Sequence, residues 1–213
     1  VIVGASVPLH RIAEDRTVRS ELAALAGAAL SIATYQIRNR ATLAGNLCHA
    51  SPAADSAPAL LVCNAAVSVA GPKGGRTVPL SELFTGVKRT CLARDEIVTA
   101  VRIPRRDART AFLKRQRIRG HDLAIASVAG AYEPRTGVLR VAVGSCCTTP
   151  VLLAPVEVAG ATVHSIVEHV MELAAASTTP ISDIRASADY RRAVLPVLLG
   201  RLVGQLLEPE GAS

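Results

Sequence analysis

The chain of 213 residues is long enough to bury the core of one or two domains. Half of its residues are apolar, but it has no Trp, three Tyr and two Phe, so aliphatic side chains must form the core, and this composition excludes a disordered chain. Lys and Arg outnumber Asp and Glu by 24 to 17, and the apolar stretch 20–34 is too short to span a membrane, which takes roughly 20 apolar residues.

The first part of the chain predicts strands and helices around one irregular segment. In chain order we expect a short buried strand at 1–4, helices at 8–15 and 18–34, a long ordered loop at 35–52 and a helix at 55–64. The loop is rich in Arg, Asn and Ala and has no regular period, and long ordered loops are often functional. Asp55 lies near the start of the last helix, where the helix dipole favours negative charge.

A hairpin and a linker come next. We expect β-prone runs at 65–70 and 77–80 joined by the sequence GPKGG, a turn at 81–84, a strand at 96–103 and a linker at 105–109. Pro104 ends the last strand, and the linker has no apolar period. The chain is therefore expected to divide into two domains, 1–104 and 105–213.

The second domain predicts an antiparallel sheet with helices. We expect a strand at 111–118, a buried apolar element of unassigned type at 123–132, a turn at 134–137, a strand at 138–144, and helices at 162–176 and 182–207. Ser182 and Asp183 are candidate caps of the last helix, and Pro196 is expected to kink or break it. Together these elements predict an α+β fold.

The cysteines and the charged residues limit the function. Five cysteines form no C-x-x-C pair, so neither a disulfide framework nor an iron-sulfur centre held by this chain alone is expected. Adjacent Cys146 and Cys147 are either redox-active or packed thiols, and most cysteines are expected to be reduced core residues. No secretory signal is visible, so a cytoplasmic location is expected.

Eight basic residues lie between Arg102 and Arg119. Basic clusters can bind nucleic acid, but Phe112 is the only aromatic residue in this one and no nucleic-acid motif is present. A solvated strand edge or a subunit contact is the favoured interpretation, and no nucleic-acid partner is expected. The five histidines lack a ligand pattern, so no metal site is expected, and without a G-x-S-x-G motif nothing supports hydrolysis.

The segment from Arg38 to Leu47 combines small residues, several backbone N–H groups and flanking cations. Small side chains let the backbone approach a phosphate, and successive N–H groups can surround its oxygens. The longer string QIRNRATLAGNLCHASPAADSAPALL, residues 36–61, closely resembles the second FAD-binding motif of the molybdenum hydroxylase flavoproteins. Residues 86–98, 122–128 and 182–192 resemble later motifs of the same family, so the resemblance covers essentially the whole chain.

This resemblance implies an incomplete FAD-binding domain of mixed sheet and helices at 1–104, and a C-terminal domain of antiparallel sheet plus helices at 105–213. It also implies an electron-transfer subunit with FAD as its cofactor. Its partners would be an iron-sulfur subunit, which relays electrons, and a molybdopterin-binding subunit, which oxidises the substrate. FAD would then pass the electrons to an acceptor.

The resemblance also implies the cofactor-binding residues: Arg38, Thr42, Leu43, Ala44, Gly45, Asn46, Ser51, Asp55, Lys114 and Leu123. The backbone of 42–46 would hold the pyrophosphate, with hydrogen bonds from the side chains of Thr42 and Asn46. Asp55 would contact the sugar-alcohol part of FAD, Lys114 would favour the reduced, anionic flavin, and Leu123 would pack near the ring. The alternatives are a helix cap for Asp55, a solvated strand lysine for Lys114 and an ordinary core leucine for Leu123.

Two departures from the family pattern bear on phosphate binding. Ala41 and Ala44 stand where relatives often have Gly, and an added methyl clashes if the backbone needs a positive φ. The family's first phosphate loop is missing before Val1, which is expected of a fragment, of a chain with a separate N-terminal piece, or of a truncated relative. A flavin-free scaffold or assembly protein derived from the family is therefore the alternative function.

Overall fold

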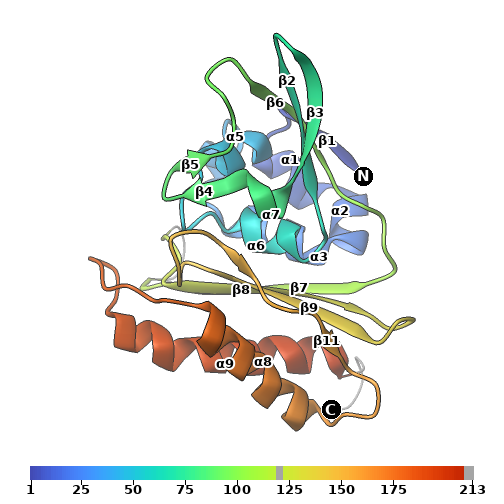
Figure 1. Ribbon diagram of the computed structural model, residues 1–213, viewed down its shortest axis with the longest axis vertical. Coiled ribbons are helices and arrows are strands. Elements are labelled where there is room, and N and C mark those ends of the chain that lie inside the picture. The colour runs from blue at the N-terminus through green and yellow to red at the C-terminus, as the bar shows by residue number, and fades with distance from the viewer. Residues whose placement is uncertain (119–121, 209–213) are drawn as a thin grey trace.

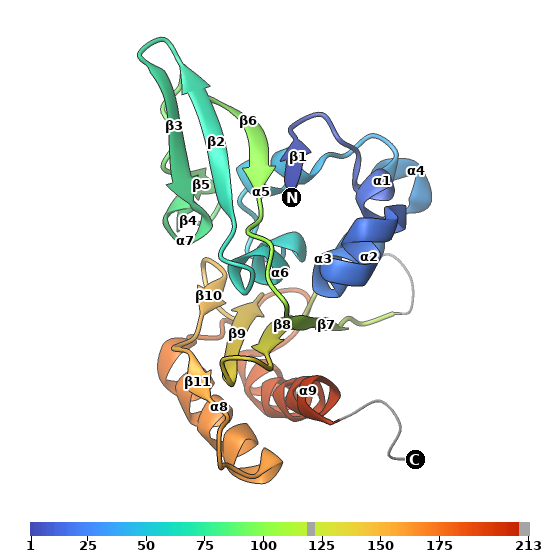
Figure 2. The same ribbon diagram turned by 90° about the vertical axis from the view of Figure 1, so that its right-hand side faces the viewer.

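Two antiparallel sheets organise the chain in the computed structural model, which describes residues 1–118 and 122–208 (Figure 1). The first sheet has the order β1-β6-β2-β3 and consists of β1 (Ile2–Gly4), β6 (Ile97–Arg102), β2 (Ala66–Gly71) and β3 (Gly74–Pro79). β2 and β3 form the predicted hairpin, and only Pro72 and Lys73 lie between the two strands. Figure 2 shows this sheet at one end of the molecule and the C-terminal helices at the other.

The helices of the first part of the chain are short. They are α1 (Leu9–Glu14), α2 (Arg16–Glu21), α3 (Ala23–Ser31), α4 (Tyr35–Arg38), α5 (Leu43–Cys48), α6 (Ser56–Leu61) and α7 (Leu80–Leu83), and α7 is followed by the small strand pair β4 (Phe84–Gly86) and β5 (Arg89–Thr90). Their buried residues are mainly Ala and Leu, as expected of an aliphatic core.

The second sheet has the order β10-β9-β8-β7, and β11 pairs with the other part of β9. Its strands are β7 (Arg109–Arg115), β8 (Ala126–Glu133), β9 (Val138–Gly144), β10 (Val151–Leu152) and β11 (Val156–Glu157). The last elements are the helices α8 (Val163–Ser177) and α9 (Ala188–Leu207). In Figure 1 this sheet lies between α3 and α6 on one face and α8 and α9 on the other.

The two faces of the second sheet differ in side-chain size because successive strand residues point to opposite faces. Ala129, Ala131 and Ala142 belong to the core shared with the first part of the chain. Val128 and Val141 point the other way, into the core formed with α8 and α9. The alanine face allows helices of the first part of the chain to approach the sheet closely.

The expected α+β class is confirmed, but several expected elements were wrong. The helix expected at 18–34 is interrupted at Leu22, and the loop expected at 35–52 contains the short helices α4 and α5. The unassigned element at 123–132 is the strand β8. The last helix begins at Ala188 rather than near 182, its N-cap is Ser187, and it continues through Pro196.

A polar contact around one buried arginine joins the second sheet to the end of α6 and to the segment between β6 and β7. Arg140 of β9 donates from Nε to the carbonyl of Val62 at 2.9 Å and from Nη2 to Glu133. Glu133 also accepts from Arg106 at 2.8 Å. The division into domains at 1–104 and 105–213 stays a proposal. The hydrogen bond from Arg140 to Val62 connects these two parts of the chain.

Two further expectations concern cysteines and membrane spans. Cys63 and Cys146 are buried, Cys48 is exposed, and Cys91 and Cys147 are half-buried, so fewer than half of the cysteines are fully buried core residues. Within residues 1–118 and 122–208, no helix is both long enough and apolar enough to cross a bilayer.

Candidate functional site

A buried ion pair joins the two parts of the chain. The ammonium group of Lys114, on β7, lies 2.7 Å from Oδ2 of Asp55, at the start of α6, and these side chains are 7% and 3% exposed. Lys114 also donates to the carbonyl of Ser31 at 3.2 Å, and the Ser31 hydroxyl donates to Asp55 Oδ2 at 3.2 Å. Three segments far apart in the sequence therefore meet at one point.

The environment of Asp55 leaves part of its carboxylate without a partner. Burial raises the pKa of the Asp55 carboxyl, and the charge and hydrogen bond of Lys114 act in the opposite direction. Oδ1 of Asp55 is buried and has no hydrogen-bond partner. Asp55 occupies the N-cap position of α6 but makes no capping hydrogen bond, so the alternative role as a helix cap is wrong.

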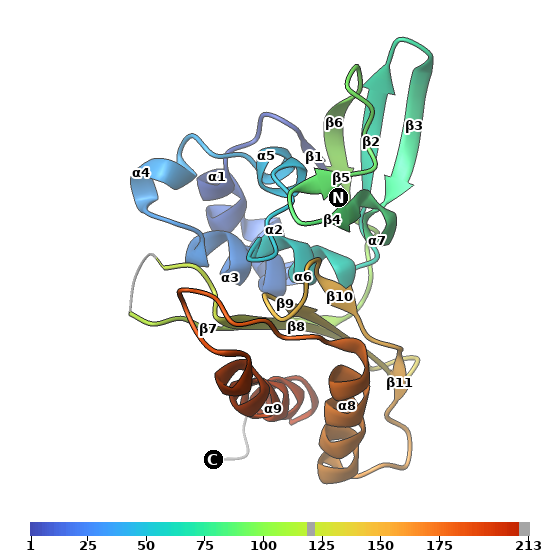
Figure 3. The ribbon, with the colours of Figure 1, turned by 60° about the vertical axis from the view of Figure 1, so that its left-hand side comes forward.

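A cavity of about 590 Å³ lies beside this ion pair. Gly27 and Ser31 of α3 line one side, and residues 112–118, including Lys114, line the other. α3 lies above β7 in Figure 3, and the cavity is formed where the two elements face each other. Its volume is within the range of small-molecule sites in proteins. Lys114 is therefore not a solvated strand lysine, since its side chain is buried at this cavity.

The residues expected to hold the pyrophosphate form the first turn of α5. Thr42 is the N-cap, and its hydroxyl oxygen accepts from the N–H of Gly45 at 3.0 Å. A Cβ at position 45 would lie 3.0 Å from this oxygen, so glycine allows the capping contact. Asn46 Oδ1 accepts from the Ser56 hydroxyl at 2.6 Å. Because Ser56 follows Asp55, this contact links α5 to the ion pair.

Leu43 and Ala44 contribute their side chains to the core, since they are 0% and 4% exposed. Only their backbone can therefore face a ligand. Ala44 lies inside α5 and does not have the positive φ that would favour glycine, so the expectation that its methyl group strains the loop was wrong. Ala33 and Ala50 do adopt a positive φ, of 48° in each case.

The other expected site residues are Arg38, Ser51 and Leu123, and none of them lines the cavity. Nη1 of Arg38 donates to the carbonyls of Ile32 and Ala33 at 3.0 and 2.8 Å, which fixes the turn that follows Ser31. The Ser51 hydroxyl accepts from the N–H of Ala53 at 3.2 Å. Leu123 is 52% exposed, so the alternative of an ordinary core leucine is wrong.

One glycine determines how close α6 lies to the second sheet. Lys114, Ser127 and Gly144 are register partners across β7, β8 and β9. A Cβ at Gly144 would lie 2.8 Å from Cγ of Pro58 in α6 and 2.5 Å from the Ser127 hydroxyl oxygen. The missing side chain of Gly144 thus sets the separation between α6, which begins beside Asp55, and the sheet that carries Lys114.

Sequence reasoning missed Ser31 as a site residue. It ends α3, contacts both Asp55 and Lys114, and lines the cavity, but serine at a helix end is common and carries no specific signal. Phe112 was read only as the single aromatic residue of the basic stretch, although it also lines the cavity.

The basic stretch is largely engaged within the molecule. Arg102 contacts Ser68, Arg105 contacts Glu21, and Arg106 contacts Glu133. Arg109 contacts the Leu206 carbonyl, and Lys114 contacts Asp55. Arg115 contacts Tyr190, and Arg117 contacts Asp122. Arg119 and His121 lie outside the described residues. Each described basic residue of this stretch therefore has an intramolecular partner, although all of them except Lys114 are exposed. Within the described ranges, no group of three or more His, Cys, Asp or Glu side chains is arranged to hold a metal ion.

Comparison with known proteins divides the chain into two matches. Residues 1–106 match the FAD binding domain in molybdopterin dehydrogenase, and residues 111–206 match the CO dehydrogenase flavoprotein C-terminal domain. The chain is 34% identical over 206 residues to the nicotine 6-hydroxylase medium subunit of Paenarthrobacter nicotinovorans, with 94% of the chain and 72% of that protein covered.

Two further similarities extend over nearly the whole chain. A putative xanthine dehydrogenase FAD-binding subunit of Escherichia coli K12 is 28% identical over 224 residues, which cover 99% of the chain and 75% of that protein. A structure of reconstituted CO dehydrogenase from Oligotropha carboxidovorans superposes with a TM-score of 0.89 and 27% identity, covering 96% of the chain and 74% of its counterpart.

Proposed function

We propose an electron-transfer role for this chain, which belongs to the family of FAD-binding medium subunits of molybdenum hydroxylases. In this role it receives electrons from iron-sulfur clusters on a partner subunit and delivers them through FAD to an acceptor. A third, molybdopterin-binding subunit oxidises the substrate. The proposed complex functions in the cytoplasm, and this location stays a prediction.

The residues around the ion pair fit a flavin cofactor. The buried Oδ1 of Asp55 has no partner in the protein, and a buried carboxylate oxygen normally accepts a hydrogen bond. A hydroxyl group of a bound sugar alcohol would supply the missing donor. The adjacent cavity, which Ser31 and Lys114 help to line, would hold the flat, polar ring. This unpaired oxygen, on a carboxylate whose partners Lys114 and Ser31 both line the cavity, is the observation that carries the proposal.

The proposed roles follow from this arrangement. Asp55 would accept a hydrogen bond from a cofactor hydroxyl through Oδ1 while Oδ2 holds Lys114 in place. Lys114 would present a positive charge to the ring, and a cation there favours added negative charge. The backbone at the start of α5, between Thr42 and Asn46, would bind phosphate oxygens. When bound, FAD supplies the redox chemistry, and the protein supplies the binding site and its charges.

One observation that favoured a flavin-free scaffold protein no longer supports that alternative. It rested partly on Ala44, whose methyl group points into the core of the protein and does not occupy a position that needs glycine. No contact in the described residues favours the scaffold over a flavin-binding subunit.

The proposal is tested on the complex purified after this chain is produced together with an iron-sulfur subunit and a molybdopterin-binding subunit. We expect the purified complex to contain one FAD per copy of this chain, and its flavin absorption to bleach on addition of the organic substrate. The variant Asp55→Asn should lower the FAD content, whereas Asp107→Asn, on the exposed stretch between β6 and β7, should not. A complex without flavin, or a flavin that the substrate never reduces, would contradict the proposal.

A further inference from the structure

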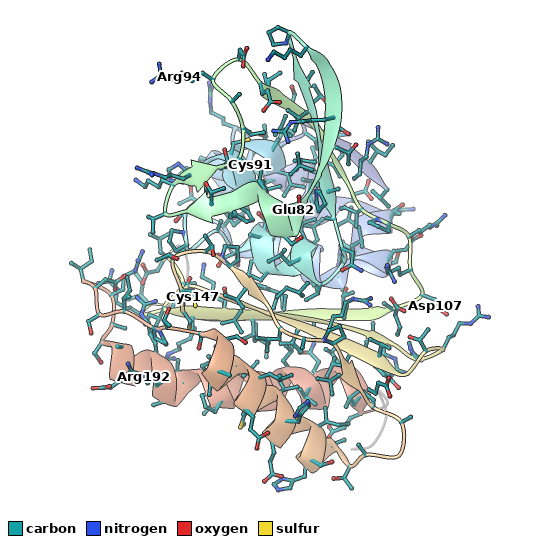
Figure 4. The ribbon with its side chains drawn as sticks, in the orientation of Figure 1. Glu82, Cys91, Arg94, Asp107, Cys147 and Arg192 are labelled. Carbon is teal, nitrogen blue, oxygen red and sulfur yellow. The ribbon has the colours of Figure 1, made fainter. Side chains whose placement is uncertain are left out.

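The first turn of α9 contains a completely buried arginine. Arg191 is 1% exposed, and its Nη1 donates to the backbone carbonyls of Ile125 and Ser145. Its Nη2 donates to Oδ1 of Asp183 at 2.8 Å. The next residue, Arg192, is labelled in Figure 4 on the lower helical layer. A guanidinium group is buried in this way only when it is paired and hydrogen-bonded, so these acceptors are needed.

Asp183 is a fixed negative partner for Arg191. Partial burial acts to raise the pKa of Asp183, but hydrogen bonds from Arg185 and from the backbone N–H groups of Arg185 and Ala186, together with the charge of Arg191, hold this pKa well below its ordinary range. The carboxylate therefore stays ionised over the whole physiological pH range and keeps the guanidinium group in one orientation.

Two neighbouring residues of α9 hold both ends of the connection between β7 and β8. Arg115 begins this connection, and its Nε donates to the Tyr190 hydroxyl at 3.0 Å. Ile125 ends it; its carbonyl accepts from Arg191, and its N–H donates to the Arg115 carbonyl at 2.8 Å. Residues 116–118 of this connection line the cavity beside Lys114.

The second carbonyl bound by Arg191 belongs to Ser145, which contacts the segment that enters α6. Ser145 follows β9 in a left-handed conformation with φ of 63°, and its N–H donates to the Pro52 carbonyl at 3.0 Å. Pro52 lies three residues before Asp55, in the segment that enters α6. Arg191 therefore contacts the end of the β7–β8 connection directly, through Ile125, and it contacts the segment that enters α6 indirectly, through Ser145. It does not line the cavity itself.

We propose that Tyr190 and Arg191 are positioning residues for the cofactor site, because they fix the two ends of the β7–β8 connection and the approach to Asp55 against the C-terminal helix. This inference rests on the proposed function. Small displacements of groups that contact a ligand weaken binding strongly, and residues behind a site usually prevent such displacements. The C-terminal helix α9 would thereby strengthen FAD binding, although it packs on the face of the sheet opposite α3 and the cavity.

The test compares Arg191→Lys with Arg140→Lys in the full complex. Arg140 is also buried and also donates hydrogen bonds to a backbone carbonyl and to a carboxylate. Its partners are Val62 and Glu133, which do not line the cavity. We expect hydrogen exchange at the amides of Ile125 and Ser145 to rise about tenfold in Arg191→Lys, and the Kd for FAD, measured by adding FAD to flavin-depleted complex, to rise about tenfold. Arg140→Lys should change the two quantities by less than about twofold, even if its melting temperature falls equally.

Unchanged exchange at these two amides, or an equal loss of FAD affinity in both variants, would overturn the inference. If Arg191→Lys fails to fold, Tyr190→Phe replaces it, because this variant removes only the hydroxyl that holds Arg115, and it should raise exchange in the connection about threefold. A wild-type complex that never binds FAD would refute the proposed function, whereas the exchange measurements would still report whether the contacts of α9 hold the two segments.

Discussion

Replacing Lys114 by Met should destabilise the protein by about 2 to 4 kcal/mol at neutral pH. The change removes one partner of a pair that is 7% and 3% exposed, and breaking a buried pair in this way costs about 3 to 5 kcal/mol. Asp55 limits this cost by taking up a proton, because burial already raises the pKa of its carboxyl. Urea denaturation of wild type and Lys114→Met measures the difference, with Lys73→Met on the exposed hairpin turn as the control.

The pH dependence separates this explanation from a simple loss of packing. Without Lys114, its charge and its hydrogen bond no longer lower the pKa of Asp55 and only the hydrogen bond from Ser31 still does, so the folded-state pKa rises further above the ordinary value of 3.8. A raised pKa contributes stability that is complete below the unfolded-state pKa and is lost as the pH rises through the folded-state pKa. The deficit of Lys114→Met should therefore shrink as the pH falls towards 3.8. The double variant Lys114→Met/Asp55→Asn should recover part of the loss. An equal deficit at all pH values, or a double variant no better than the single one, would refute the reasoning.

Three other predictions test the surrounding structure. Gly144→Ala should cost about 1 to 3 kcal/mol in urea denaturation, because its Cβ would lie 2.8 Å from Pro58 Cγ; a neutral effect would mean that α6 does not depend on this close approach. Ala44→Gly should lower stability by about 1 kcal/mol and should not tighten FAD binding in a titration, and tighter binding would contradict the helical conformation at this position. Hydrogen bonds from Arg140, partly opposed by burial, lower the pKa of Glu133 from 4.5 to about 2, so stability that is present above pH 4.5 should be lost as the pH falls towards 2. Arg140→Lys should reduce this loss in thermal melts across the same range, and an unchanged profile would assign the acid sensitivity to other groups.

The sequence predicted those helices and strands that are set by neighbouring residues, such as turns and helix caps. The hairpin of β2 and β3 follows from a glycine-rich turn between β-prone runs, and α8 begins where Thr162 caps the helix by accepting from the N–H of Ser165. β8 could not be assigned because six of its eight residues are buried, so both faces are apolar and the period of two disappears. The start of α9 was misplaced because the turn before it is held by Arg191, which contacts residues far away in the sequence.

The candidate site depends even more on distant contacts. Asp55 and Lys114 are 59 positions apart, and no local pattern pairs a carboxylate in one segment with a lysine on a strand of a distant sheet. Only the resemblance of residues 36–61 to a known motif drew attention to Asp55. Ser31 was missed because its importance comes entirely from where α3 ends in space, beside the ion pair.

The most direct test of the central claim is a titration of flavin-depleted complex with FAD, followed by the quenching of flavin fluorescence. Wild type should bind one FAD per copy of this chain. The variant Asp55→Asn keeps the size of the side chain but lacks the charge that holds Lys114, and it should bind FAD at least tenfold more weakly. Equal affinity in wild type and Asp55→Asn, with both proteins folded, would contradict the claim that FAD binds at the buried ion pair.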